Sequence, residues 1–347
     1  MTTKAAERWC DMIMALGTKG REARESAPAT DAVPKRPAIG RPETIEEMVG
    51  QAAVIGRLRI VIEGAKARGV RVPNVLVSGP AGFGKTSLAH VIANTLEVPL
   101  IGTAGPILRK TGDLHGLLSS VRGKAVLFCD EIHRLPNEVS ESLYQALEDD
   151  QLSILRGYGA DARAITVDLP PITFVGATDR PGLLPKPLRD RFGFHAVMAP
   201  YSNEELATIV QRAFTRAGFP DATTGAALAV AERCRGVPRI GIHLGERVAD
   251  VASLEAVPLD VELALRALAA FDVDAHGLGG DDYRLLNALV HTFGGRPVGM
   301  TSLMDCLDLD ESTLREHESP LIRGGWMVRT RAGRMAMPKS HELIGPL

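Results

Sequence analysis

The sequence predicts an α/β domain whose mostly parallel sheet carries helices on both faces, followed by an all-helical domain and a winged helix. Short apolar runs alternate with stretches of helical periodicity from about residue 72 to residue 176, which is typical of a parallel sheet covered by helices. The region 202–272 shows helical patterns throughout. The region 281–347 combines three helical patterns with a glycine-turned apolar hairpin, which indicates a winged helix.

Within the α/β part, strands are expected where apolar runs are short, and helices where apolar residues recur at every third or fourth position. Residues 151–168 differ, because two apolar segments flank a turn that contains Gly157 and Gly159. This pattern predicts a β-hairpin inserted into the domain. The expected strands are 75–77, 98–101, 125–129 and 172–176, and the expected helices are 85–96, 113–120 and 138–149.

Four segments are expected along the chain. The first, 1–38, is an extension that ends in a Pro-containing linker. It is either a short amphipathic helix or a disordered tail, and the apolar residues at helical spacing are Trp9, Met12, Ile13 and Leu16. The α/β domain then takes 39–201, the helical domain 202–275 and the winged helix 276–347. In the helical domain, Ser202 and Glu205 form the expected capping box of one helix, and Gly236 is expected to end another.

Composition limits the possible functions. The 347 residues include 40 basic and 42 acidic side chains, a net charge of −2, so any nucleic-acid surface must be a local patch. The hydrophobic share of 45% excludes a disordered or fibrous chain, and no apolar run reaches the roughly 18–20 residues of a membrane span. The four cysteines are widely separated and read as free thiols of a reducing compartment, which predicts a cytoplasmic protein.

The segment 79–86 (Gly-Pro-Ala-Gly-Phe-Gly-Lys-Thr) matches the GxxxxGK[ST] pattern of a phosphate-binding loop and lies between an expected strand and an expected helix. Its glycines let backbone N–H groups surround the phosphates of ATP. Lys85 would reach the β- and γ-phosphates, and the Thr86 hydroxyl would bind Mg²⁺. The predicted nucleotide-binding residues of this segment are Gly79, Gly82, Phe83, Gly84, Lys85, Thr86 and Ser87.

A second signal is the apolar strand 125–129, which runs directly into Asp130 and Glu131. Asp130 would hold Mg²⁺ through water, and Glu131 would polarise the water that attacks the γ-phosphate. Such a pair is common at strand ends, but its position 45 residues after Lys85 makes it a strong signal. His133 is interpreted as a local hydrogen-bonding residue and not as a catalyst.

At this point the sequence resembles RuvB, the AAA+ motor family of bacterial Holliday-junction branch migration. The resemblance covers about residues 39–338, in order through all three domains. The segments that carry it are 41–51 (Arg-Pro-Glu-Thr-Ile-Glu-Glu-Met-Val-Gly-Gln), 130–135 (Asp-Glu-Ile-His-Arg-Leu), 176–180 (Gly-Ala-Thr-Asp-Arg), 187–193 (Pro-Leu-Arg-Asp-Arg-Phe-Gly), 235–240 (Arg-Gly-Val-Pro-Arg-Ile), 293–299 (Phe-Gly-Gly-Arg-Pro-Val-Gly) and 329–334 (Arg-Thr-Arg-Ala-Gly-Arg).

The resemblance implies further roles at the nucleotide site. Val49, Gly50 and Tyr201 should surround the adenine. Arg191 should be the arginine finger that completes the site of a neighbouring subunit, with Arg189 the less favoured alternative. A cation supplied in this way stabilises charge on the transferred phosphoryl group. Arg239 should contact the γ-phosphate from the helical lid.

The resemblance also implies partners. Hairpin 151–168 corresponds to the element with which RuvB binds RuvA. The alternative is that the hairpin packs only on its own domain. Its apolar residues are Ile154, Leu155, Ile165 and Val167. The winged helix should contact the phosphate backbone of duplex DNA or of a four-way junction, because 319–341 contains basic residues and no acidic residue. The arginines expected to bind DNA, unless they form only a solvated basic face, are Arg323, Arg329, Arg331 and Arg334.

Three departures from the family pattern mark a divergent member. Asp179 stands where the family usually has Thr, at the sensor-1 position near the γ-phosphate, and a carboxylate there would repel phosphate or take up a proton. Thr178 could replace it only if the strand end shifted register. The segment 241–247 is less basic than usual, and the phosphate loop has Ala81 and Phe83 where Pro and Leu are usual.

The favoured function is an ATP-driven DNA motor that forms a ring, expected to be a hexamer, and is encoded by a bacterium, phage or plasmid. ATP would be hydrolysed between subunits, with ATP and Mg²⁺ as the ligands and a RuvA-like protein as partner. The alternative is a nucleotide-dependent scaffold that binds DNA or protein while Asp179 suppresses hydrolysis. A clamp loader or replication-initiator loader is disfavoured by the DNA-directed wing and the inserted hairpin.

Overall fold

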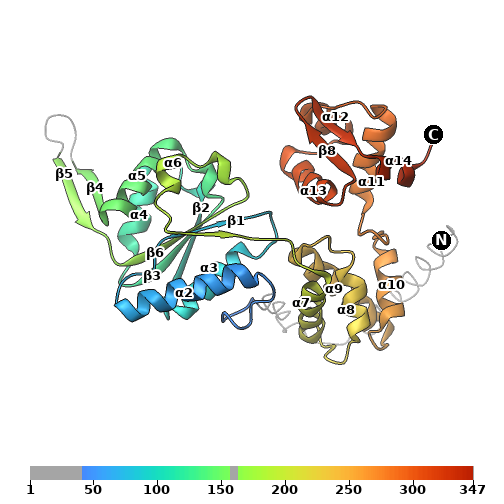
Figure 1. Cartoon of the computed structure of the whole chain (residues 1–347), viewed down its shortest axis with the longest axis horizontal. Coiled ribbons are helices and arrows are strands. Elements are labelled where there is room, and N and C mark those ends of the chain that lie inside the picture. Colours follow the sequence, from blue (N-terminus) through green and yellow to red (C-terminus); the bar gives the residue numbers. More distant parts are fainter. Residues whose placement is uncertain (1–40, 157–162, 347) are drawn as a thin grey trace, which may run out of the picture.

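The computed structural model describes residues 41–156 and 163–346 (Figure 1). The extension 1–38, for which either a helix or a disordered tail is expected, lies outside the described residues. None of the helices in the described ranges is both long and apolar enough to cross a membrane.

The ATPase domain is built on a five-stranded parallel sheet with the order β2-β3-β6-β1-β7. The three central strands are buried, as expected for strands covered on both faces. Because the strands are parallel, the carboxyl ends of β1, β3 and β6 meet at one edge of the sheet. The strand bounds are β1 Val75–Ser78, β2 Leu100–Ala104, β3 Ala125–Asp130, β6 Ile172–Thr178 and β7 Phe194–Val197.

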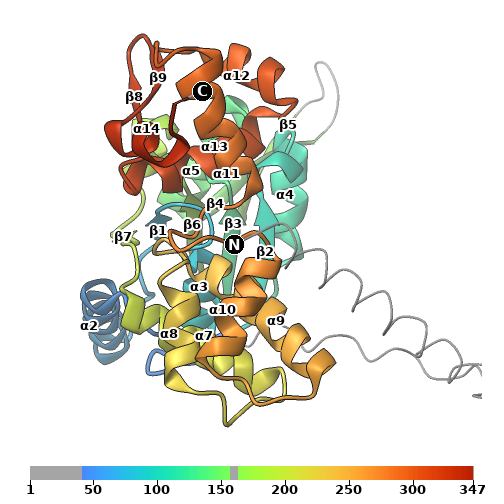
Figure 2. The same cartoon turned by 90° about the vertical axis from the view of Figure 1, so that its right-hand side faces the viewer.

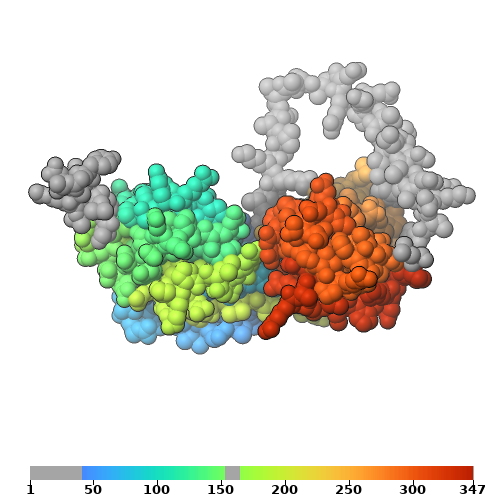
Figure 3. Space-filling model, turned by 90° about the horizontal axis from the view of Figure 1, so that it is seen from above, coloured from blue at the N-terminus to red at the C-terminus, as the bar shows by residue number. Residues whose placement is uncertain are grey.

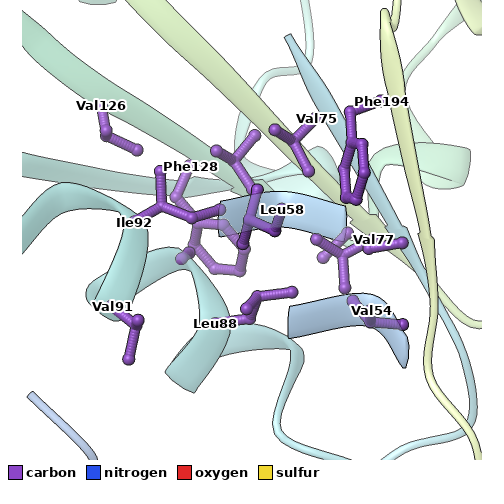
Figure 4. Packing of buried hydrophobic residues seen from close by; sticks show 14 of the residues in the cluster. Val54, Leu58, Val75, Val77, Leu88, Val91, Ile92, Val126, Phe128 and Phe194 are labelled. Carbon is purple, nitrogen blue, oxygen red and sulfur yellow. The ribbon is translucent and has the colours of Figure 1, made fainter. Parts of the chain in front are cut away.

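Helices cover both faces of this sheet. On one face, α2 (Ala52–Arg68) and α3 (Lys85–Thr95) pack against the central strands, and Figure 4 shows Leu58, Leu88 and Ile92 of these helices in one cluster with Val75 and Val126 of the sheet. On the other face lie α4 (Thr111–Ser120) and α5 (Asn137–Asp149). The expected α/β layers are therefore present, and each face has its own hydrophobic core.

Two strands differ from expectation. The run 98–101 was expected to be a strand, but β2 begins only at Leu100. The Val98 N–H donates to the Ala93 carbonyl (3.1 Å) and Glu97 adopts a left-handed conformation, so Val98 belongs to the closure of α3. The edge strand β7 is not apparent in the sequence, since it is short and buries only alternate residues.

The predicted hairpin is present as β4 (Gln151–Arg156) and β5 (Arg163–Asp168), an antiparallel pair outside the main sheet. Ile154 pairs with Ile165 in its register, and Leu152 pairs with Val167. In Figure 1 the hairpin projects from the ATPase domain on the side away from the winged helix. It is therefore placed to reach another molecule.

The helical domain contains α7 (Asn203–Arg216), α8 (Thr224–Ala231), α9 (Pro238–Glu255) and α10 (Val261–Ala270). The capping box of Ser202 and Glu205 is present as predicted. Gly236, however, does not end a helix: α8 stops at Ala231, and Gly236 lies with a positive φ in the turn that enters α9. This turn brings the start of α9 to the ATPase domain.

The winged helix contains the expected helices and a two-stranded wing, and Figure 2 shows it on the opposite side of the molecule from most of the lid. The space-filling view from above places the ATPase domain and the winged helix at its two ends (Figure 3). The elements are α11 (Gly280–Asn287), a π-helical turn (Ala288–Thr292), α12 (Met300–Leu307), α13 (Glu311–Arg323), β8 (Met327–Thr330), β9 (Gly333–Ala336) and α14 (Pro338–Ile344).

Candidate nucleotide site

The predicted phosphate loop connects the carboxyl end of β1 to the first residue of α3. Gly82 and Gly84 have φ angles of 80° and 89°, a region that L side chains rarely adopt. A side chain at Gly82 would also meet Val237 at 2.9 Å and Arg239 at 3.0 Å. The glycines therefore let the loop turn sharply and let the lid approach it closely. A loop of this shape at a helix N-terminus suits a phosphate ligand.

Lys85 lies inside this loop. Its Nζ donates to the carbonyl oxygens of Gly79 (2.8 Å) and Pro80 (3.0 Å). Burial lowers the pKa of Lys85, and the nearby carboxylates of Asp130 and Asp179 oppose that shift. Lys85, at the start of α3, is thus the point where the charges that end β3 and follow β6 meet.

Asp130 ends β3 and Glu131 follows it in a left-handed conformation with φ 47°. The Glu131 N–H donates to Asp130 Oδ1 (2.9 Å), which fixes the aspartate beside the loop. The Glu131 carboxylate is half exposed and pairs with Arg134 at 3.0 Å. Burial, assisted by the charge of Asp130, raises the pKa of Cys129 to about 12, so its thiol stays protonated at neutral pH.

The end of β6 accommodates Asp179, the residue predicted to stand at the sensor-1 position, beside His133 and Arg180. Asp179 Oδ1 lies 3.5 Å from His133 Nδ1, and its Oδ2 lies 3.7 Å from Arg180 Nε. Thr178 is buried, pairs in register with Ser78, and places its hydroxyl 3.0 Å from His133 Nδ1. Thr178 thus lies within the pairing of β6 with β1, and Asp179, the next residue, is one of the carboxylates whose charge acts on Lys85.

The predicted adenine residues are partly brought together. Gly50 lies against the ring of Tyr201, and the Tyr201 hydroxyl donates to the Phe83 carbonyl (3.3 Å). Val49 precedes Gly50 and is half-buried. Sequence reasoning missed Gln51, whose amide exchanges two hydrogen bonds with the Ala199 backbone and so holds the segment 49–51 beside Tyr201.

The two predicted arginines have different positions. Arg239 lies in the first turn of α9, its N–H donates to the Gly82 carbonyl (3.4 Å), and its charge acts on Lys85. Arg191 instead pairs with Glu148 at the end of α5, with 2.5 Å between Nη2 and Oε2. The lid arginine is therefore at the nucleotide site of its own chain, whereas Arg191 makes its ion pair elsewhere.

The residues expected to bind Mg²⁺ offer oxygen ligands of the right kind. Thr86, in the first turn of α3, supplies a hydroxyl, and Asp130 supplies a carboxylate next to Lys85. Within the described ranges no three His, Cys, Asp or Glu side chains gather into a metal site. This donor set fits Mg²⁺, which commonly binds one or two protein oxygens and completes its shell with water and phosphate.

The structure separates the four arginines that were predicted to bind DNA. Arg329 and Arg331 are exposed on the wing. Arg334 pairs with buried Glu318, with 3.0 Å between Nε and Oε1. The guanidinium carbon of Arg323 lies 5.3 Å from the centre of the Phe83 ring, in the phosphate loop.

The pair of Arg334 and Glu318 supports a prediction about stability. Replacing Arg334 by Ala strands a buried carboxylate and should cost about 3–5 kcal/mol of unfolding free energy, measured by urea denaturation. The double variant Arg334→Met with Glu318→Leu removes both charges and should recover most of that loss. Arg329→Ala, on the exposed wing, should change stability by less than about 0.5 kcal/mol. Equal losses for Arg329→Ala and Arg334→Ala would contradict this interpretation.

The hairpin residues are only partly described. Ile165 and Val167 are 40% and 43% exposed, and strand alternation puts them on one face of β5. The side chains of Ile154 and Leu155 lie outside the described part of the structure. These two exposed apolar side chains are the described part of the face that was predicted to dock a partner.

Comparison with known proteins identifies the family. Three family models match consecutive segments: the Holliday junction DNA helicase RuvB P-loop domain at 40–198, the RuvB AAA lid domain at 201–274 and the RuvB C-terminal winged helix domain at 275–345. A relative from Parafrankia sp. (strain EAN1pec), named Holliday junction branch migration complex subunit RuvB, is 45% identical over 307 residues, which cover 88% of this chain and 87% of that protein.

Solved structures agree with this result. The Thermotoga maritima RuvB Holliday junction branch migration motor is 37% identical, with a TM-score of 0.79 over 88% of this chain and 97% of that one. A mutant of the same Thermotoga maritima protein matches with a TM-score of 0.80 and 37% identity, over 88% of this chain and 98% of that one. The phosphate loop, the lid and the winged helix thus follow one shared plan, and the chain belongs to the RuvB family.

Proposed function

We propose that this protein is an ATP-driven motor that moves the branch point of four-way DNA junctions, as a homo-oligomeric ring. One observation carries the proposal. Lys85, the consecutive pair Asp130 and Glu131, and Arg239, from three separate segments, converge at one edge of the sheet in a chain that also carries the family's winged helix. Such a motor would work on DNA in the cytoplasm.

In this mechanism the loop 79–86 binds the phosphates of ATP through backbone N–H groups, and Lys85 exchanges its carbonyl partners for phosphate oxygens. Glu131, half exposed and acceptor-only when ionised, orients the attacking water and takes its proton. Arg239 would bind the γ-phosphate and thereby couple the lid to the nucleotide. Tyr201 and the segment 49–51 would enclose the adenine.

Mg²⁺ would be held by Thr86 and, through water, by Asp130. When bound, this ion neutralises charge on the phosphate oxygens. Asp130 is prepared for this role because one of its oxygens already accepts the Glu131 N–H, which fixes the orientation of its carboxylate.

A direct test measures steady-state ATP hydrolysis by the full chain with and without a four-way junction, together with branch migration of a labelled junction. The motor requires turnover that rises with the junction and drives migration. Tight ATP binding without turnover would instead support the scaffold alternative, which Asp179 at the sensor-1 position keeps open. Turnover that rises only with a clamp or helicase client would support a loader.

Asp179 leads to a prediction that separates the motor from the scaffold. Because His133 and Arg180 flank the Asp179 carboxylate, they screen its negative charge, and its repulsion of the γ-phosphate is weakened. Asp179→Thr should lower the KM for ATP about threefold, through loss of a screened like charge, and change kcat little. Asp221→Thr, at an exposed residue between α7 and α8, is a matched control. A wild type without turnover that Asp179→Thr activates would exclude the motor.

The hairpin leads to a prediction about the partner. Ile165→Asp places a charge in an exposed apolar face and should abolish co-purification with a RuvA-like protein, while ATP binding stays unchanged. Thr166→Asp lies on the opposite face of β5 by strand alternation and is the matched control. Pull-down that survives Ile165→Asp would mean that the partner binds elsewhere.

A further inference from the structure

The winged helix contacts the phosphate loop of its own chain. Arg323, the last residue of α13, has its guanidinium carbon 5.3 Å from the centre of the Phe83 ring. A guanidinium within about 6 Å of an aromatic centre is attracted by the electron-rich face of the ring. In the described ranges Arg323 has no carboxylate within ion-pair distance, so the ring is its principal partner.

Phe83 is enclosed from more than one side. Its side chain is fully buried, and its ring meets the Tyr201 ring edge-on with 6.4 Å between centres. The Tyr201 hydroxyl donates to the Phe83 carbonyl, and the Arg239 N–H donates to the carbonyl of Gly82. Because Gly82 and Gly84 make the adjacent backbone permissive, these anchors decide where residues 82–84 lie.

A second contact holds the winged helix to the lid. Arg235, in the turn that leads to Arg239, places Nη1 3.1 Å from Asp282 Oδ2. The side chain of Asp282 is 2% exposed, and its other oxygen lies 2.8 Å from His317 Nδ1 on α13. Both His317 and Arg323 belong to α13, so the ionic contact at the lid fixes the helix that carries the phosphate-loop contact.

Charge supports the same arrangement. Partial burial lowers the pKa of Arg323, and the positive charge of nearby Arg235 lowers it further. Two cations therefore lie close together at this junction. Asp282 neutralises Arg235, and the face of Phe83 accommodates Arg323. A leucine at position 83 would offer no such face.

We propose that Arg323 is a positioning residue of the nucleotide site, which holds the phosphate loop through Phe83 and so couples the pose of the winged helix to nucleotide affinity. The proposal rests on the proposed function, because it requires the loop to bind ATP. Coupling between two binding events is reciprocal. DNA that shifts the winged helix must therefore change the nucleotide affinity, and nucleotide must change the DNA affinity by the same factor.

The test uses the full chain and measures the Kd of a fluorescent ATP analogue, the KM and kcat for ATP, and the effect of a four-way junction on that Kd. Arg323→Ala should raise the Kd and the KM about three- to tenfold while kcat changes less than about twofold. Arg323→Lys, which keeps a cation over the ring, should retain most of the affinity. The junction should change the Kd less in Arg323→Ala than in wild type.

A double-mutant cycle makes the test specific. Phe83→Leu should weaken nucleotide binding, and adding Arg323→Ala to it should have no further effect, because the two residues act as one contact. Arg315→Ala, on the same helix but paired with Glu311, is the matched control and should leave the Kd unchanged. Thermal unfolding of every variant checks that each is folded, and only folded variants enter the comparison.

The outcomes are distinct. A wild type that binds no nucleotide would refute the proposed function itself. A wild type that binds, together with an Arg323→Ala variant of equal Kd, would overturn the positioning role alone. The positioning role would also be overturned if Arg323→Ala raised the Kd for nucleotide equally in wild type and in Phe83→Leu. It would be overturned as well if Arg323→Ala lowered only the DNA affinity, which would make Arg323 a DNA contact.

Discussion

Glu131→Gln is expected to reduce junction-stimulated ATP hydrolysis by about a hundredfold or more, while nucleotide binding stays intact. The substitution keeps the size and shape of the side chain and an oxygen that can accept from Arg134, whose Nη1 lies 3.0 Å from the carboxylate. It removes the negative charge and the proton-accepting group. Because Glu131 holds no phosphate in the proposed mechanism, its loss should lower kcat and leave the Kd for ATP nearly unchanged.

Rapid-quench hydrolysis with labelled ATP, beside equilibrium binding, measures both quantities. Glu138→Gln, at an exposed carboxylate in the first turn of α5, is the matched control and should behave as wild type. If hydrolysis survives in Glu131→Gln, another group must take the proton, and the assignment of β3 as the catalytic strand would fail. Loss of ATP binding would instead show that Glu131 is needed to shape the site.

Local sequence patterns predicted the parts of the site that depend on neighbours along the chain. The phosphate loop, the carboxylates after β3 and the capping box at Ser202 are short patterns whose geometry is set by a few consecutive residues. The start of β2 was missed for a related reason. After α3, Glu97 adopts the left-handed conformation that usually requires glycine at the end of a helix. Because the residue here is a glutamate, the sequence does not show where α3 ends.

Contacts between distant segments were beyond prediction. Four arginines in one acid-free stretch appear equivalent in the sequence, but the fold gives them different partners. Arg334 meets Glu318 because β9 pairs with β8, the strand that packs on α13, and Arg323 reaches Phe83 only because the winged helix folds back to the phosphate loop. His133 was interpreted as a local hydrogen-bonding residue, and its approach to Thr178 and Asp179 depends on the pairing of β3 with β6.

Arg191→Ala is expected to lower kcat for ATP by about a thousandfold, with ATP binding retained, because a finger acts on charge that develops in the transition state. In its own chain Arg191 pairs with Glu148, and it is not among the charged groups that act on Lys85. An intact site would then need a neighbouring subunit. Arg189→Ala, two residues earlier, removes the less favoured candidate; if the large loss followed Arg189 instead, the assignment would be wrong.

Mixing two inactive variants tests whether the finger acts between subunits. Arg191→Ala subunits keep the phosphate loop, and Lys85→Ala subunits keep the finger, so a mixed ring contains some sites with both. Hydrolysis should therefore reappear on mixing. Its rate should be the fraction of the wild-type rate that corresponds to the share of interfaces where an Arg191→Ala subunit receives the finger of an adjacent Lys85→Ala subunit. A finger that served its own chain would give no recovery at any ratio. Because Arg191 must leave Glu148 to act, Glu148→Gln in the finger-bearing subunits should not abolish the recovery.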